Sequence, residues 1–171
     1  MKSGHDKRLN KRKIRPRDRP EKRWFRLDNA AKIYPAIMHT RHGSVFRLAA
    51  LLREQVDPEK LQQALDLVMP RFPQFAVRLR RGIFWYYLET CNKPALIGED
   101  VNNPLRPWSR ADAKSYLFRV RYGDRRIAVE FFHALTDGYG ASVFLRTLIA
   151  AYLSLRGIAC PAGEGILAFN D

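Results

Sequence analysis

The chain contains 171 residues with a mass of 19.9 kDa, which suits one domain with a hydrophobic core. Apolar residues make up 46% of it and charged residues 28%, so the chain is too apolar to be disordered throughout. Its two cysteines exclude a disulfide framework, and its most apolar run, Val143 to Leu155, is interrupted by Arg146 and falls short of the roughly 18 residues that span a membrane. The basic start lacks the apolar segment of a secretory signal, which predicts a cytoplasmic protein.

Positive charge is concentrated at the beginning of the chain. Residues 2–23 contain eleven Lys or Arg and three acidic residues, so they carry +8 of the net charge of +14. Leu9 and Ile14 are the only clearly apolar side chains there, which predicts a disordered basic tail over residues 1–23. Such a tail can bind nucleic acid or an anionic membrane, but blocks of like charge are more often solvated, so we favour an extension without a dedicated partner. No aromatic residue precedes Trp24, so the tail has no platform for stacking on bases.

The folded part begins at Trp24, and its first two elements follow from apolar spacing. Residues 45–52 are mostly apolar and are bounded by Gly43 and Arg53, which predicts a strand. Asp57 and Pro58 suit the cap and the first position of a helix, and apolar residues at helical spacing continue to Met69.

Four β-rich runs predict two hairpins, each with a short glycine-containing turn. The segment between the hairpins, residues 90–113, is rich in Asn, Pro and Asp and is predicted to be a loop with one short ordered piece. The paired runs are 75–79 with 83–88, and 115–122 with 126–132.

The last predicted element is a helix over residues 138–155 with a wide apolar face, closed by Arg156 and Gly157. Residues 158–171 contain proline and glycines and are predicted to be loose. The order strand, helix, hairpin, hairpin, helix predicts an α+β fold, in which helices pack on one face of a mixed or antiparallel sheet.

Residues 130–140, Glu-Phe-Phe-His-Ala-Leu-Thr-Asp-Gly-Tyr-Gly, connect the last predicted strand to the last predicted helix. His133 falls at the strand end, and Asp137 and Gly138 fall at the helix entrance, where Asp is a good cap and Gly permits a turn. An imidazole can accept a proton near neutral pH, so His133 is a candidate general base. A histidine beside aromatic rings can equally be a core residue, and spacing alone leaves both interpretations open.

The run from His133 to Gly138 resembles the His-x-x-x-Asp-Gly signature of the chloramphenicol-acetyltransferase-like superfamily, which includes condensation domains and alcohol acetyltransferases. The similarity runs from about Trp24 to the C-terminus, with the lobe itself expected over 24–157, and is strongest to the N-terminal lobe of the alcohol-acetyltransferase-like branch. Besides the signature, the segments that carry it are 28–35, 57–59, 71–79 and 84–89.

This resemblance implies an acyltransferase in which His133 takes a proton from an acceptor, an alcohol or similar group, that attacks an acyl thioester. The donor would be acyl-CoA, taken to be acetyl-CoA, or a carrier-bound acyl group, with no covalent acyl-enzyme, no bound cofactor and no metal. Asp137 would pair with a basic residue and hold the loop, and Gly138 would permit the turn and a close approach to substrate. Phe132, Thr136 and Tyr139 are expected next to the substrate.

Two departures from the family pattern affect these expectations. Many relatives carry a second histidine directly before the first, where this chain has Phe132. Relatives are also usually more than twice as long, with two similar lobes, and this sequence matches the first lobe only. We therefore expect the lobe to be incomplete alone and to need the second lobe or self-association. Within this chain, Arg78 and Arg119 are the candidate basic partners for Asp137.

Two function classes remain on the sequence. The first is an O-acyltransferase lobe, complete in an assembly or inactive as an isolated half. The alternative is a non-catalytic single-lobe interaction protein whose basic tail binds nucleic acid or an anionic surface. His39 and His42 lack further metal ligands nearby in the sequence, so they are not expected to form a metal site. Cys91 and Cys160 are predicted to be ordinary reduced thiols.

Overall fold

Two β-sheets and two α-helices make up the part of the chain that a computed structural model describes. The described residues are 23–26, 45–83, 85–102, 104–109, 112–160, 163 and 165–167, so nearly all of the predicted tail and part of the predicted loose C-terminal segment lie outside them. The strands are β1 (Trp24–Arg26), β2 (Val45–Leu51), β3 (Val77–Arg81), β4 (Tyr86–Thr90), β5 (Ile97–Glu99), β6 (Phe118–Tyr122) and β7 (Arg126–Phe132). The helices are α2 (Pro58–Val68) and α3 (Gly138–Leu155), with 3-10 turns η1 (Met69–Arg71), η2 (Pro73–Phe75) and η3 (Asp112–Lys114).

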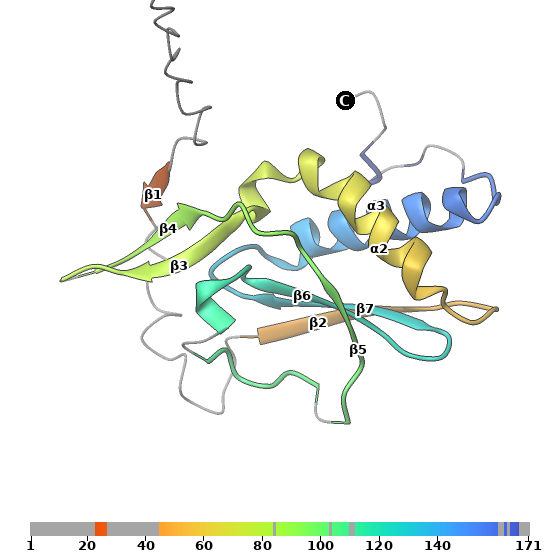
Figure 1. Cartoon of the computed structure of the whole chain (residues 1–171), viewed down its shortest axis with the longest axis horizontal. Coiled ribbons are helices and arrows are strands. Elements are labelled where there is room, and N and C mark those ends of the chain that lie inside the picture. Colours follow the sequence, from red (N-terminus) through yellow and green to blue (C-terminus); the bar gives the residue numbers. More distant parts are fainter. Residues whose placement is uncertain are drawn as a thin grey trace, which may run out of the picture.

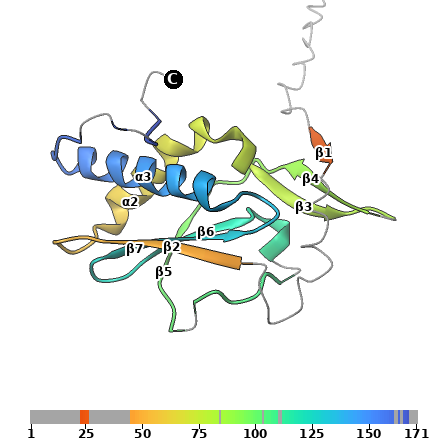
Figure 2. The same ribbon diagram turned by 180° about the vertical axis from the view of Figure 1, so that it is seen from behind.

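The larger sheet has the strand order β2-β7-β6-β5. Its first three strands are antiparallel neighbours, whereas β5 runs parallel to β6. Both α-helices lie on one face of this sheet, as Figures 1 and 2 show from opposite sides. The predicted α+β fold, a mixed sheet with helices on one face, is confirmed.

The smaller sheet, β1-β4-β3, contains the first predicted hairpin in a shifted position. The predicted strand over 75–79 begins instead at Val77, because Phe75 belongs to η2 and its ring is buried. The turn also moves: the amide of Gly82 donates to the carbonyl oxygen of Trp85 at 2.7 Å, so Arg81 is still part of the ladder. The hairpin prediction is correct in topology and wrong by about two residues in its bounds.

The main core lies between the helices and the larger sheet. Aromatic rings dominate it, with Phe144 of α3 packed 5.6 Å from Phe131 of β7 and 5.3 Å from Phe118 of β6, measured between ring centroids. α2 contributes Leu61 and Leu65, both fully buried. These contacts hold α3, and with it the connection from β7, against the sheet.

α3 is long and apolar enough, by length and composition alone, to cross a membrane, which corrects the prediction that the apolar run in this part of the chain is too short. Arg146 lies within it, but the helix is continuous for 18 residues. Seven of its residues are buried, including Phe144, Leu148 and Tyr152, which is the pattern of a core helix packed on its own protein.

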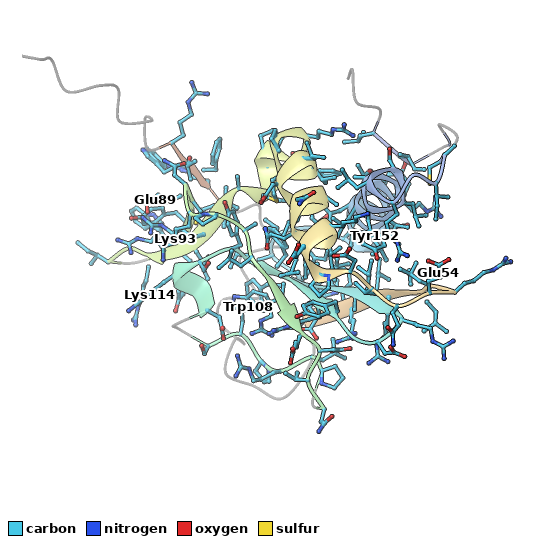
Figure 3. All side chains as sticks on the ribbon, turned by 45° about the vertical axis from the view of Figure 1, so that its right-hand side comes forward. Glu54, Glu89, Lys93, Trp108, Lys114 and Tyr152 are labelled. Carbon is cyan, nitrogen blue, oxygen red and sulfur yellow. The ribbon has the colours of Figure 1, made fainter. Side chains whose placement is uncertain are left out.

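The two helices are joined at one end by polar contacts. Asp57 caps α2 by accepting from the amide of Lys60 at 3.1 Å, as predicted. The amide of Asp57 itself donates to the hydroxyl of Tyr152 on α3 at 2.9 Å. Figure 3 shows Tyr152 beside the start of α2. This hydrogen bond gives the hydroxyl group of the buried Tyr152 a polar partner.

The face of the larger sheet away from the helices carries a network of ion pairs. Arg47 of β2 donates to Asp100 through two nitrogens, at 2.9 and 2.5 Å, and to Glu130 of β7 at 3.0 Å. Arg126 also pairs with Asp100, at 2.7 Å, and Arg119 of β6 pairs with Glu130 at 3.3 Å. Glu130 is only 2% exposed, so this carboxylate depends on its two arginine partners for stabilisation.

Acid is expected to weaken the fold through Asp100. Hydrogen bonds from Arg47 lower the pKa of Asp100 to about 2 against the opposing effect of burial, and Arg126 lowers it further. An Asp carboxyl titrates near pH 3.9 in an unfolded chain, so this stabilisation is complete above that pH and is lost as the pH falls toward 2. We expect Asp100→Asn to be less stable than wild type at pH 7 and to show a flatter dependence of unfolding free energy on pH between 4 and 2.

Urea unfolding at pH 7, 4, 3 and 2 measures this dependence. Asp124→Asn is the matched control, because the Asp124 side chain is 65% exposed and pairs only loosely with Arg125, at 3.6 Å. The control should keep the wild-type profile, and an unchanged acid slope in Asp100→Asn would contradict the prediction.

Candidate active site

His133 lies directly after β7, in the turn that leads to α3. Phe132 is the last residue of β7, and its carbonyl oxygen accepts from the amide of Leu135 at 2.8 Å, which closes the turn. Helix α3 begins at Gly138. The predicted placement of His133 at the end of a strand and before a helix is therefore confirmed.

The side chain of His133 is half-buried against an aromatic ring from the neighbouring strand. Its ring centroid lies 4.4 Å from that of Phe46 on β2, with the planes tilted by 41°. Phe46 pairs with Phe131 in the ladder and stacks on it at 5.9 Å. The imidazole is thus supported by packing on one side while part of its surface stays accessible, an arrangement that suits proton exchange with a bound molecule.

Phe132 faces away from His133 into a second, smaller core. It is fully buried, and its ring lies 6.2 Å from Trp108, beside Leu79 and Leu117. Side chains alternate along a strand, so Phe131 faces the main core and Phe132 faces the opposite side of the sheet. Of the three residues expected next to the substrate, Phe132 is the one without exposed surface.

Asp137 fixes the entrance of α3. Its carboxylate accepts from the amide of Gly140 at 2.9 Å, and its backbone carbonyl accepts from the amide of Ala141 at 3.1 Å. This is the N-cap role that the sequence predicts. Thr136 is half-buried in the same turn, whereas Tyr139 is 74% exposed on the first turn of the helix.

The expected pairing of Asp137 with Arg78 or Arg119 is wrong. Arg78 donates to Glu89 at 2.8 Å, and Arg119 forms its ion pairs with Glu130 and Asp112. Each arginine lies directly opposite its glutamate in a strand ladder, which explains the choice of partner. Among the described residues no basic side chain forms an ion pair with Asp137.

Gly140, rather than Gly138, is the glycine that the turn requires. A Cβ atom at Gly140 would lie 2.2 Å from Oγ1 of Thr136, whereas one at Gly138 would meet nothing within 4 Å. Gly138 also does not adopt positive φ, so the predicted need for glycine at that turn position is not borne out. The sequence shows a glycine at position 140, but the reason for it, the close approach of Thr136, becomes visible only in the structure.

We expect Gly140→Ala to destabilise the protein by about 1 to 3 kcal/mol, because Thr136 and the helix start must move apart. Gly138→Ala is the matched control and should be neutral or slightly stabilising, since the space there is open and alanine favours a helix. Thermal unfolding of the two variants measures the difference. Equal melting temperatures would show that Thr136 accommodates the added carbon without cost.

The other candidate residues do not assemble into a site. Cys91 is buried and Cys160 half-buried, and both are free thiols. His39 and His42 lie outside the described residues. Within the described part of the chain no group of three or more His, Cys, Asp or Glu side chains could hold a metal ion.

Comparisons with known proteins show similarity in structure alone. No family model and no curated protein matches the sequence. Polyketide synthase associated protein 5 from Mycobacterium tuberculosis is similar with a TM-score of 0.60 at 18% identity, over 81% of this chain and 35% of that chain. The starter condensation domain of rhizomide synthetase RzmA gives 0.58 at 15% identity, over 82% and 40%. SgcC5 from Streptomyces globisporus gives 0.57 at 17%, over 82% and 39%.

The chain therefore spans 35 to 40% of the length of these three similar proteins. A mutant of the RzmA domain has been crystallised in complex with C8-CoA, and it is similar to this chain with a TM-score of 0.59 at 15% identity. At 15 to 18% identity, the similarity to these proteins shows the fold alone. The described chain therefore has the α+β fold found over part of the RzmA starter condensation domain and of polyketide synthase associated protein 5, consistent with a single lobe.

Proposed function

We propose that this chain is a lobe of an O-acyltransferase, with His133 as the general base. The observation that carries the proposal is the position of His133, half-exposed at the end of β7 and supported by Phe46, within a fold shared with a domain crystallised with C8-CoA. The donor would be acyl-CoA and the acceptor an alcohol. Acetyl-CoA is the donor that the resemblance to alcohol acetyltransferases favours.

The reaction needs one proton relay. An imidazole nitrogen of His133 takes the proton of the acceptor hydroxyl, and the oxygen attacks the thioester carbonyl carbon. The tetrahedral intermediate collapses with cleavage of the C–S bond, and the proton on His133 passes to the departing thiolate. Positioning and this proton transfer supply the rate, because no covalent bond to the protein forms. Asp137 would act as a positioning residue, since it caps α3 and so holds the turn that carries His133.

A second surface is needed to enclose the reactants. Tyr139 is 74% exposed next to the His133 turn, and the chain spans 35 to 40% of the length of these similar proteins. We propose that a second lobe, from a longer form of the protein or from another chain, completes the site. Self-association of this lobe is the simplest arrangement to test.

Free-thiol release from acetyl-CoA and octanoyl-CoA, with and without a panel of primary alcohols, tests the proposal. Sedimentation analysis of the same sample reports whether the lobe self-associates. We expect release that requires an alcohol and that rises more steeply than linearly with protein concentration if two chains build the site. A folded, associated sample that releases no thiol with any alcohol would contradict the proposal for this chain.

One observation favours a second candidate, a binding protein for single-stranded nucleic acid. Trp24, the first residue of β1, is 66% exposed and directly follows the basic segment 2–23, and Trp85, in the connection before β4, is 64% exposed. Exposed aromatic rings in the same chain as a run of positive charge would supply the stacking platform that the tail itself lacks. Salt-sensitive binding of a labelled oligonucleotide, lost on replacing both tryptophans with alanine, would support this candidate, whereas equal binding to anionic vesicles would indicate charge attraction only.

A further inference from the structure

A pocket of about 220 Å³ lies along β6, apart from the candidate active site. Residues from the segments 94–98 and 115–121 line it, together with Trp108 and Asp112. β5 pairs with β6 only from Ile97 onward, so the chain before β5 borders the pocket instead of continuing the ladder. His133 is not among the lining residues, so a ligand of this pocket would bind whether or not the proposed acyl transfer occurs.

Two buried N–H groups without a partner, Nε1 of Trp108 and Nε of Arg121, belong to residues lining this pocket. Within the described part of the chain, Nη2 of Arg119 is the other buried side-chain nitrogen without a hydrogen bond, and it lies 3.2 Å from Oδ2 of Asp112 in an ion pair. Trp108 is 1% exposed, and Figure 3 shows it between η3 and β5. Because folded proteins leave few buried donors unpaired, two around one pocket indicate a site for a hydrogen-bond acceptor.

The charges around the pocket favour a single negative charge on that acceptor. Arg119 stacks on Trp108, with its guanidinium carbon 3.9 Å from the ring centroid, and its charge is balanced by Glu130 and Asp112. Arg121 donates to the backbone carbonyl of Glu99 at 3.3 Å, and no described carboxylate forms an ion pair with it. Arg121 is therefore the uncompensated cation at this pocket.

The remaining wall is apolar and the space is small. Pockets for drug-sized ligands hold roughly 300 to 1,000 Å³, so this pocket suits a smaller molecule. Leu96, at the surface, is 71% exposed, and apolar side chains continue inward from it. The apolar lining residues are Pro94, Ala95, Leu96, Ile97, Phe118 and Val120.

We propose that this pocket binds a small organic carboxylate with a short apolar tail. The carboxylate oxygens accept from Arg121 and from the indole N–H of Trp108, and the tail lies against the apolar wall. A charged acceptor satisfies the unpaired donors, and a planar carboxylate matches the geometry of a guanidinium.

Nuclear magnetic resonance of the indole N–H groups tests the site with hexanoate as the probe. The chain has three tryptophans, and Trp108 is the buried one, so its peak can be assigned by its loss in Trp108→Phe. We expect hexanoate to shift the Trp108 peak saturably and to leave the peaks of Trp24 and Trp85 in place. Hexanamide lacks the charge and acetate lacks the tail, so each should bind at least about tenfold more weakly than hexanoate.

Two variants probe Arg121 in different ways. Arg121→Gln removes the charge, whereas Gly98→Ala keeps it but adds a Cβ atom 2.5 Å from Nη1 of Arg121, which displaces the flexible end of that side chain. Both should weaken hexanoate binding at least about tenfold. Arg125→Gln, at an exposed position away from the pocket lining, is the control and should bind as wild type does.

The proposal is overturned if hexanoate gives no saturable shift of the Trp108 peak, or if both Arg121-directed variants bind it normally. It is also overturned if inorganic phosphate or hexanamide binds as well as hexanoate, because the site would then not recognise a carboxylate with an apolar tail. The comparison of hexanoate with hexanamide on the wild-type chain decides this point even where a variant fails to fold.

Discussion

Replacing His133 with glutamine or alanine is expected to lower acyl transfer to an alcohol by two to four orders of magnitude, the usual contribution of a general base. The fold should survive, because the His133 side chain is half-exposed and Phe46, 4.4 Å from it, keeps its packing on Phe131. The measurement is alcohol-dependent thiol release from acyl-CoA at saturating substrate, together with the melting temperature of each variant.

Arg125→Gln is a suitable control for this experiment. Arg125 lies in the turn before β7, at the opposite end of the strand from His133, and its side chain is 60% exposed. The control should retain wild-type activity. Wild-type rates in His133→Gln would remove the general-base role, while the assignment of the fold would stand.

Replacing Glu130 with alanine is expected to destabilise the protein by about 3 to 5 kcal/mol, the usual cost of breaking a buried ion pair on one side. Glu130 is 2% exposed and pairs with Arg47 at 3.0 Å and Arg119 at 3.3 Å. It also accepts from the amide of Leu105 at 3.2 Å, so the substitution leaves two guanidinium groups and one amide without this acceptor. For a domain of this size, the melting temperature should fall by roughly 10 °C.

Asp124→Ala removes an acidic partner from an exposed pair and serves as the comparison. Asp124 and Arg125 are 65% and 60% exposed and lie 3.6 Å apart, so the loss should stay below about 1 kcal/mol. Urea unfolding at pH 7 measures both variants. Equal stability of Glu130→Ala and Asp124→Ala would contradict the prediction, because the buried ion pairs of Glu130 would then stabilise the fold no more than an exposed pair does.

The elements that the sequence predicts best are those with a long apolar pattern and clear ends. α3 spans residues 138–155 as expected, because Asp137 caps its start and Gly157, at φ +78°, ends it. β5 was not predicted, since three residues carry too little pattern and its parallel pairing with β6 depends on distant parts of the chain.

The candidate site was predictable only where it is local in sequence. The positions of His133 and Asp137 follow from the strand, the turn and the helix that contain them. Phe46 could not be assigned to the site, because its contact with His133 requires the pairing of β2 with β7. Arg119 was assigned wrongly for the same reason, since the register places it opposite Glu130.

The pairing of β2 with β7 also determines when the lobe can fold during synthesis. Leu51 pairs with Arg126 and Val45 with Phe132, so the partners are 75 to 87 positions apart along the chain. At about 5 to 20 residues per second, a ribosome would release β2 roughly 4 to 17 s before the matching part of β7. During that interval the apolar side chains of β2 have no partner strand, which makes the nascent chain prone to aggregation and gives a chaperone time to bind it.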